Sequence, residues 1–234
     1  MDYYPKDIIS RFIHLILMLT GIAVVSIVIS VSINTGANSL NLSSKITAFE
    51  KAQEINKYIM LRSVAVDTHY GKCTGVVQIN DKSAGATILT AKHCTDEKRW
   101  IEVEGQVPYT VVESQNYDLS VIFTPYLENK KEVIISTDLP AIGDKIYHIG
   151  RQNESPLVVS GEYHWNEYFN HVVKIDADFG SSGGGLFNDK GELIGIVSTV
   201  YDGDQSGRYT SALSNLVVLD FLLSEVMSTE NKSE

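Results

Sequence analysis

The sequence has few cysteines and few basic residues for its length, and each shortage excludes a class of function. Its 234 residues include only two cysteines, Cys73 and Cys94. Two cysteines at this spacing cannot supply a metal-binding set, although they could form one disulfide. Whether they pair depends on the compartment in which the protein folds.

Basic residues are outnumbered by acidic residues, 19 against 29, which gives a formal net charge of −10. The charges of the first 40 residues cancel, so the whole acidic excess falls on the remainder of the chain. Proteins that bind nucleic acid normally present a basic patch to the phosphates. We therefore expect no nucleic-acid partner.

Long hydrophobic runs are absent except for one, at residues 12–33. This run contains no Asp, Glu, Lys or Arg, and about 20 such residues span a bilayer as a helix. A cleaved secretion signal would have a shorter apolar region, about 7–15 residues, and a small-residue cleavage site. We therefore predict a retained transmembrane helix over residues 12–33, in contact with the lipid bilayer.

Positive charge lies on one side of this run, because Lys6 and Arg11 precede it and the next basic residue is Lys45. The positive-inside rule then predicts that residues 1–11 form a cytoplasmic tail. The rest of the chain is expected on the extracytoplasmic side, periplasmic or extracellular. That side permits disulfides, which raises the expectation that the two cysteines pair.

Residues 34–62 are predicted to form a polar linker and an amphipathic helix. Ser44 can cap this helix, and apolar residues recur at steps of three and four from Ile46 to Ile59. We expect the apolar face to pack on the following domain. The alternative is a self-association helix, which is short for a coiled coil.

The pattern changes at about residue 63. About a dozen short apolar segments, separated by turns, run from Val64 to Thr210. Helical periodicity returns only at about Leu213–Met227. The pattern predicts an all-β sandwich or barrel followed by a C-terminal helix.

Three places in this region carry chemistry: His93 in Thr-Ala-Lys-His-Cys, Asp118 before an apolar strand, and the run Gly-Ser-Ser-Gly-Gly-Gly at residues 180–185. Each alone has an ordinary explanation, as a surface histidine, a turn aspartate or a flexible linker. The Gly/Ser run, however, leads straight into an apolar hairpin, which a linker does not usually do. In the order His, Asp, Ser, the three supply the groups needed for acyl transfer.

These segments resemble the chymotrypsin-like (trypsin-like) serine peptidases. The histidine motif is similar to Thr-Ala-Ala-His-Cys, the aspartate motif to Asp-Leu/Ile-Ala-Leu, and residues 180–185 to Gly-Asp-Ser-Gly-Gly-Pro. The resemblance implies two six-stranded antiparallel β-barrels over residues 63–234, a protein or peptide substrate, and neither cofactor nor metal. It also implies roles: Ser182 as nucleophile, His93 as general base, Asp118 as its partner, and the N–H groups of Gly180 and Ser182 as the oxyanion hole.

The resemblance extends to the substrate site and to the cysteines. It implies a disulfide between Cys73 and Cys94, which would hold the histidine loop. The backbone of Ser198, Thr199 and Val200 would pair with an extended substrate. Asp176 lies where family members that prefer Arg or Lys keep a carboxylate. The alternatives are that Asp176 is a solvated strand-end residue, that Asp178 faces the pocket instead, or that His164 and His171 line it and favour acidic substrates.

One departure from the family is informative. Ser181 stands where the family has the aspartate that pairs with a new N-terminus after activation, and no Ile-Val-Gly-Gly site occurs. Both features indicate an enzyme without N-terminal zymogen activation. The short interval between His93 and Asp118 resembles that of the compact bacterial and viral members.

Taken together, the sequence predicts a membrane-anchored serine endopeptidase that works through an acyl-enzyme. The alternative is a catalytically weak or inactive trypsin-fold module that binds or scaffolds at the membrane. A third possibility, an α/β hydrolase, needs alternating helices and strands, which the pattern lacks.

Overall fold

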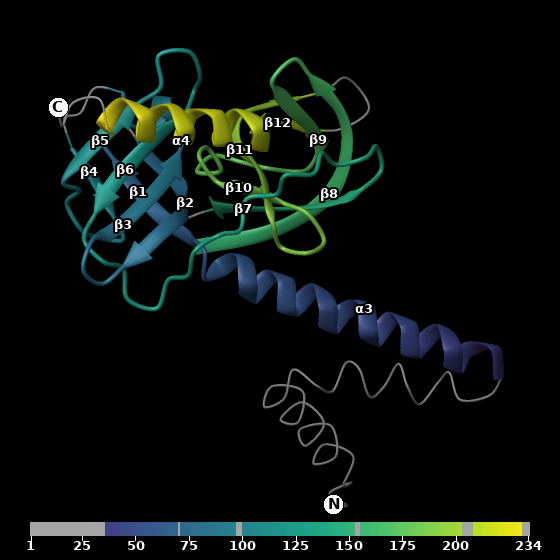
Figure 1. Ribbon diagram of the computed structural model, residues 1–234. Coiled ribbons are helices and arrows are strands. Elements are labelled where there is room, and N and C mark those ends of the chain that lie inside the picture. Colours follow the sequence, from purple (N-terminus) through teal and green to yellow (C-terminus); the bar gives the residue numbers. More distant parts are fainter. Residues whose placement is uncertain (1–35, 70, 97–99, 153–154, 203–207, 231–234) are drawn as a thin grey trace, which may run out of the picture. The chain divides into compact units, whose positions relative to one another are not determined.

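The structure is a computed structural model that describes residues 36–69, 71–96, 100–152, 155–202 and 208–230 (Figure 1). The predicted cytoplasmic tail and transmembrane segment, residues 1–33, lie outside these residues. Within the described residues, no helix is both long enough and apolar enough to cross a membrane.

The chain divides into two units, Met1–Gln53 and Glu54–Glu234. Helix α3 (Gly36–Met60) runs across this boundary and begins earlier than the cap expected at Ser44. No proline interrupts the segment before Ser44, so nothing in its backbone stops the helix from extending. In the second unit, Ile55 and Ile59 of α3 are buried in a hydrophobic cluster.

The first half of the second unit is a six-stranded antiparallel sheet in the order β4-β1-β2-β3-β6-β5. Its strands are β1 (Ser63–Thr68), β2 (Gly71–Asp81), β3 (Gly85–Thr90), β4 (Ile101–Val103), β5 (Thr110–Glu113) and β6 (Ser120–Thr124). Alternate apolar residues such as Val64, Val66 and Ile88 point into its core, as the period of a strand requires.

This sheet is barrel-like and open. Among the described residues, its end strands β4 and β5 do not pair with each other. The two are among the shortest strands in the sheet and offer few backbone groups with which to close it. The two six-stranded antiparallel sheets implied by the resemblance are therefore present, and in the described residues only the second is a closed barrel.

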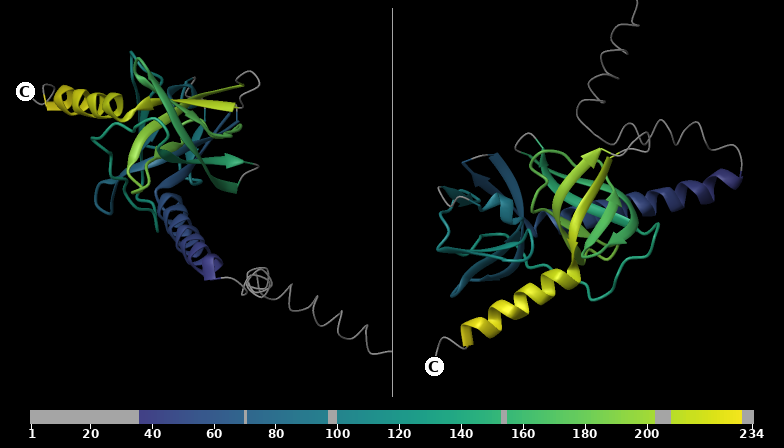
Figure 2. Two further views of the ribbon diagram at one scale, coloured as in Figure 1. Left: turned by 90° about the vertical axis from the view of Figure 1, so that its right-hand side faces the viewer. Right: turned by 90° about the horizontal axis from the view of Figure 1, so that it is seen from above.

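The second half is a closed six-stranded barrel in the order β10-β11-β12-β9-β8-β7 (Figure 2). Its strands are β7 (Lys145–Gln152), β8 (Ser155–Glu167), β9 (Asn170–Lys174), β10 (Gly185–Phe187), β11 (Leu193–Asp202) and β12 (Arg208–Ser214). Ile146, Val173, Leu186 and Val197 are among the residues that fill it. Helix α4 (Asn215–Glu230) follows β12 and confirms the predicted C-terminal helix.

The two sheets share a hydrophobic cluster. Leu89 and Val121 of the first sheet pack in it with Ile149 and Phe187 of the second and with Phe221 of α4. Burying side chains of this size stabilises the fold by about 1.5–3 kcal/mol each. The cluster holds the ends of β3 and β6 beside β10 and β11, the strands that carry the predicted site.

Candidate active site

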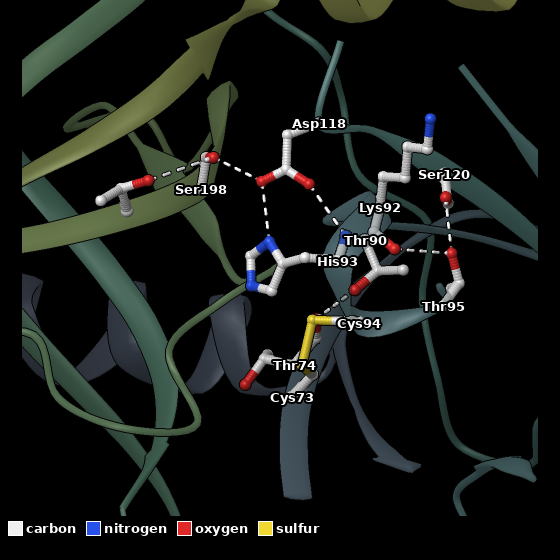
Figure 3. Close-up of polar contacts among 11 residues, drawn as sticks. Cys73, Thr74, Thr90, Lys92, His93, Cys94, Thr95, Asp118, Ser120 and Ser198 are labelled. Carbon is white, nitrogen blue, oxygen red and sulfur yellow. Dashed lines mark hydrogen bonds and ion pairs between the residues drawn. A yellow bond between two sulfur atoms is a disulfide. The ribbon is translucent and has the colours of Figure 1, made fainter. Parts of the chain in front are cut away.

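His93 lies in a short 3-10 helix, η1 (Lys92–Cys94), directly after β3. The Thr95 hydroxyl donates to the carbonyl of Lys92 at 2.9 Å and closes this turn. The disulfide between Cys73 and Cys94, implied by the family resemblance, is confirmed and ties η1 to β2 (Figure 3). His93 is therefore held on a short, cross-linked element.

Asp118 holds the His93 ring from the bend that precedes strand β6. The His93 Nδ1 atom lies 2.8 Å from Asp118 Oδ2, and the His93 backbone N–H donates to Oδ1 at 2.9 Å (Figure 3). A carboxylate only accepts hydrogen bonds, so Nδ1 carries the hydrogen. The Nε2 atom is then left with a lone pair, as a general base requires.

Ser198 contacts the same carboxylate through its side chain, because its hydroxyl donates to Asp118 Oδ2. The register of the β11–β12 pair shifts between Val197 and Thr199, so Ser198 is the extra residue of a β-bulge. Bulges next to active sites commonly re-aim one side chain in this way. The sequence suggested only a backbone role for Ser198, since a bulge leaves no clear mark in the sequence.

Electrostatics favour an ionised Asp118 beside His93. The hydrogen bond to Asp118 raises the pKa of His93 above its ordinary value, against the opposing effect of burial. Burial acts to raise the pKa of Asp118, but hydrogen bonds from the His93 ring, the Ser198 hydroxyl and the His93 N–H together lower it. The carboxylate therefore stays charged and stabilises the imidazolium form of His93.

Ser182 lies in a glycine-rich turn that packs on the first sheet. Its carbonyl accepts the N–H of Thr74 at 2.9 Å, and Gly183 N–H donates to the carbonyl of Val197 at 2.8 Å. Gly183 has a φ of +78°, and a Cβ at this position would lie 2.1 Å from Thr90 Oγ1. Only glycine fits, which explains how the turn approaches the end of β3 that carries His93.

Two backbone N–H groups of this turn are the ones that the resemblance implies for an oxyanion hole. Among the described residues, the N–H groups of Gly180 and Ser182 have no hydrogen-bond acceptor. The carbonyl of Gly180 points the other way and accepts from Thr74 Oγ1 at 2.7 Å and from Arg151 N–H at 3.2 Å. Gly180, with a φ of +89°, is thus held in one orientation.

No hydrogen bond joins Ser182 Oγ to His93 Nε2 in the part of the chain that the structure describes. Such bonds are commonly long before substrate binds and tighten in the Michaelis complex. The glycine-rich turn places the backbone of Ser182 beside the end of β3 and the bulge of β11.

A cavity of about 340 Å³ opens beside Ser182. Its lining comes from the loop before Ser182 and from β11 and β12: Ala177, Asp178, Phe179, Ser182, Val200, Tyr201 and Arg208. Of the positions predicted for substrate binding, only Val200 lines this cavity, while Asp176, Ser198 and Thr199 do not. Arg208, Phe179 and Tyr201 were missed, because no local motif marks them.

Asp176 is not among the residues that line this cavity. Its side chain is 84% exposed and lies 3.4 Å from the guanidinium of Arg208. Asp178, the alternative, does line it. His164 packs edge-on against Trp165 and Tyr209, and His171 is buried against Tyr163 and Asn215.

The edge of β11 is suited to an extended peptide. Strand β12 pairs with β11 on one side, and on the other side β10 reaches only as far as Ile196. Beyond the bonds of Val197, the described residues leave that edge unpaired along Ser198–Val200. A substrate strand can add there. In the described residues, no cluster of three or more His, Cys, Asp or Glu side chains could hold a metal ion.

The family model for the trypsin-like peptidase domain matches residues 73–196, which include His93, Asp118 and Ser182. The chain belongs to the trypsin-like peptidase family. It is accordingly a serine peptidase, and the resemblance noted in the sequence is confirmed. Comparison with curated protein sequences finds no match.

Solved structures of other peptidases have the same fold. A serine-to-alanine mutant of Rv3671c from M. tuberculosis, in its inactive form, is 13% identical with a TM-score of 0.62, covering 73% of this chain and 89% of that one. The serine endoprotease from Yersinia pestis is 22% identical with a TM-score of 0.60, covering 73% of this chain and 65% of that one. At these identities the likeness of this trypsin-like peptidase to them is one of fold.

Proposed function

We propose that this trypsin-like peptidase is a membrane-anchored serine endopeptidase with Ser182 as nucleophile, His93 as general base and Asp118 as the group that orients it. The observation that carries the proposal is the contact of Asp118 with both His93 and Ser198. It fixes the imidazole with Nδ1 protonated and Nε2 free to take a proton. A solvated turn aspartate would not need three donors.

The first half of the reaction is acylation. Ser182 Oγ attacks the carbonyl carbon of the scissile bond while His93 Nε2 takes the hydroxyl proton. The carbonyl oxygen gains the negative charge and accepts the N–H groups of Gly180 and Ser182, where losing one donor typically costs about 3 kcal/mol of barrier. The His93 imidazolium gives its proton to the leaving amine as the C–N bond breaks.

The second half is hydrolysis of the acyl-enzyme. His93 Nε2 takes a proton from water, whose oxygen attacks the ester carbonyl carbon. The tetrahedral oxyanion forms again at the same two N–H groups. When it collapses, the proton returns from His93 to Ser182 Oγ and the carboxylic acid leaves. Asp118 stays ionised in both halves and stabilises each imidazolium.

The anchor is proposed from residues 12–33, with Lys6 and Arg11 on the cytoplasmic side and the peptidase domain, residues 63–234, on the extracytoplasmic side. The disulfide between Cys73 and Cys94 supports that placement, because such bonds persist in oxidising compartments. A fusion of the full chain to alkaline phosphatase at its C-terminus tests it. The fused enzyme should be active only if the domain leaves the cytoplasm.

Substrate preference depends on the charges around the cavity. The proposal that Asp176 selects Arg or Lys must take account of Arg208, whose guanidinium lies 3.4 Å from the Asp176 carboxylate. We propose that this pair weakens any preference for basic side chains before the cut. Backbone groups of Ser198, Thr199 and Val200 would hold the chain on either side of a side chain in the cavity.

Turnover of internally quenched peptides tests the endopeptidase function. The wild type should cleave within the peptide, and both Ser182→Ala and His93→Ala should lose turnover. Ser160→Ala, at an exposed serine of β8, is the matched control and should keep it. If Ser182→Ala cleaved as fast as the control, Ser182 would not be the nucleophile.

The alternative is a trypsin-fold binding or scaffold module with little activity. It predicts peptide binding that does not depend on Ser182 and no burst of product in the wild type. The aligned His93–Asp118 pair favours the enzyme, since a module without chemistry has no need of it.

A further inference from the structure

His148 is a buried histidine that the proposed mechanism does not use. It lies on β7 with a relative exposure of 1%. Its Nδ1 atom lies 3.1 Å from the carbonyl of Gly185, which can only accept, so Nδ1 carries the hydrogen. Burial lowers the pKa of His148 to about 4, so the ring is neutral at physiological pH.

The other ring nitrogen of His148 lacks a hydrogen-bond partner in the part of the chain that the structure describes. Its Nε2 atom is buried and has no hydrogen-bond partner among the described residues. With the hydrogen on Nδ1, Nε2 is an acceptor. Leaving a buried acceptor without a donor costs about 1–3 kcal/mol, so a donor is expected close by.

A hydroxyl close to His148 belongs to Ser181, the residue between the two proposed oxyanion donors. A Cβ on Gly150 would lie 2.5 Å from Ser181 Oγ and 2.9 Å from His148 Nε2, so both atoms lie against one side of that glycine. Ser181 Oγ already accepts the N–H of Asp178 at 3.2 Å. Its own hydrogen has no acceptor among the described residues.

The two groups border the same small cavity. Its volume is about 20 Å³, and its lining includes His148, Gly150 and Ser181. A cavity of this size accommodates one water molecule, which needs two or more polar partners. His148 Nε2 and the Ser181 hydroxyl are two such partners.

We propose that His148 and Ser181, bridged by one buried water, are positioning residues for the oxyanion turn. The inference rests on the proposed function, because it concerns the N–H groups of Gly180 and Ser182. Ser181 makes two backbone hydrogen bonds within that turn. Its N–H donates to the carbonyl of Asp178 at 3.0 Å, and its carbonyl accepts from the N–H of Gly184 at 2.9 Å. Fixing its side chain fixes the peptide planes on both sides.

Two substitutions of His148 separate its two nitrogens. His148→Asn can keep the bond to Gly185 but has no acceptor where Nε2 was, whereas His148→Gln places an amide oxygen near that point. We expect kcat to fall about tenfold in His148→Asn with KM changed less than about twofold, because losing a full oxyanion donor costs about 10²–10³ in kcat. His148→Gln should restore most of the loss.

Ser181→Ala provides a second, smaller change that tests the same contact. It should lower kcat by a similar factor, and the double variant with His148→Asn should be no slower than the slower single variant, because both remove one connected unit. A boronic-acid peptide, which engages the oxyanion hole, should lose affinity in step with kcat. A product-like peptide should keep its affinity.

The results separate this inference from the proposed function. If the wild type does not turn over peptide, the proposed function fails. If it does, but His148→Asn keeps wild-type kcat or its effect multiplies with that of Ser181→Ala, the positioning role fails. A high-resolution crystal structure adds a direct readout: a water within hydrogen-bond distance of both groups supports the proposal, and a dry cavity contradicts it.

Discussion

The disulfide between Cys73 and Cys94 is expected to stabilise both the fold and the active site. It closes a loop with a sequence separation of 21. In the chain-entropy model, a loop of this length contributes about 3 kcal/mol to the free energy of unfolding. Replacing both cysteines by alanine should remove about that much. For a domain of this size, the melting temperature should fall by roughly 6–12 °C.

The same bond should affect catalysis, because each of its ends adjoins an element of the proposed active site. Cys94 follows His93, and Cys73 precedes Thr74, which holds the carbonyls of Gly180 and Ser182. We expect the double alanine variant to lose about tenfold in kcat when assayed well below its melting temperature, since small displacements at an active site cost up to about 10².

Denaturant unfolding and peptide turnover, each with and without a reducing agent, measure these effects. The reducing agent should shift the wild type toward the variant and leave the variant unchanged, which provides an internal control. A difference in unfolding free energy below about 1 kcal/mol, or a wild type that the reducing agent does not affect, would refute the reasoning.

Three further predictions concern single groups. His93 must be neutral to accept a proton, and its pKa is raised, so kcat/KM of the wild type should fall as the pH drops through a pKa above 6.5. In Asp118→Asn this acid limb of the pH profile should move to lower pH, and kcat should fall by several orders of magnitude. Gly183→Ala should abolish turnover, because a Cβ there would collide with Thr90 and with the backbone of β2. A circular dichroism melt should show the accompanying loss of stability, and an unchanged melt with full turnover would contradict the prediction. Arg208→Gln should raise the ratio of cleavage after lysine to cleavage after glutamate roughly fivefold, which corresponds to about 1 kcal/mol for a partly exposed charge. Competition assays with matched peptides measure this ratio, and an unchanged ratio would contradict a role for Arg208 in the cavity.

The sequence was sufficient for the fold class, and its motifs led to the residues proposed here as catalytic. His93, Asp118 and Ser182 each lie next to an apolar strand and within a short motif, so local patterns locate them. The strands were recognisable because their alternation of buried and exposed residues is local as well. Whether the first sheet closes could not be recognised from the sequence, because closure depends on whether the short strands β4 and β5 meet.

Contacts between residues far apart in the chain could not be predicted. Asp176 and Arg208 are 32 residues apart and meet because β9 and β12 are neighbours in the barrel. Ser198 reaches Asp118 through a bulge, across a separation of 80 residues. The surroundings of the unsatisfied His148 nitrogen depend on how closely the glycine-rich turn that contains Ser181 and Ser182 approaches Gly150.

Covalent labelling with a fluorophosphonate probe, followed by peptide mapping, tests the central claim most directly. The probe reacts with a serine only where a base activates its hydroxyl. The account predicts a single adduct on Ser182 in the wild type, no adduct in Ser182→Ala or His93→Ala, and a slower but complete reaction in Ser181→Ala. Labelling that persists in Ser182→Ala and disappears in Ser181→Ala would contradict it.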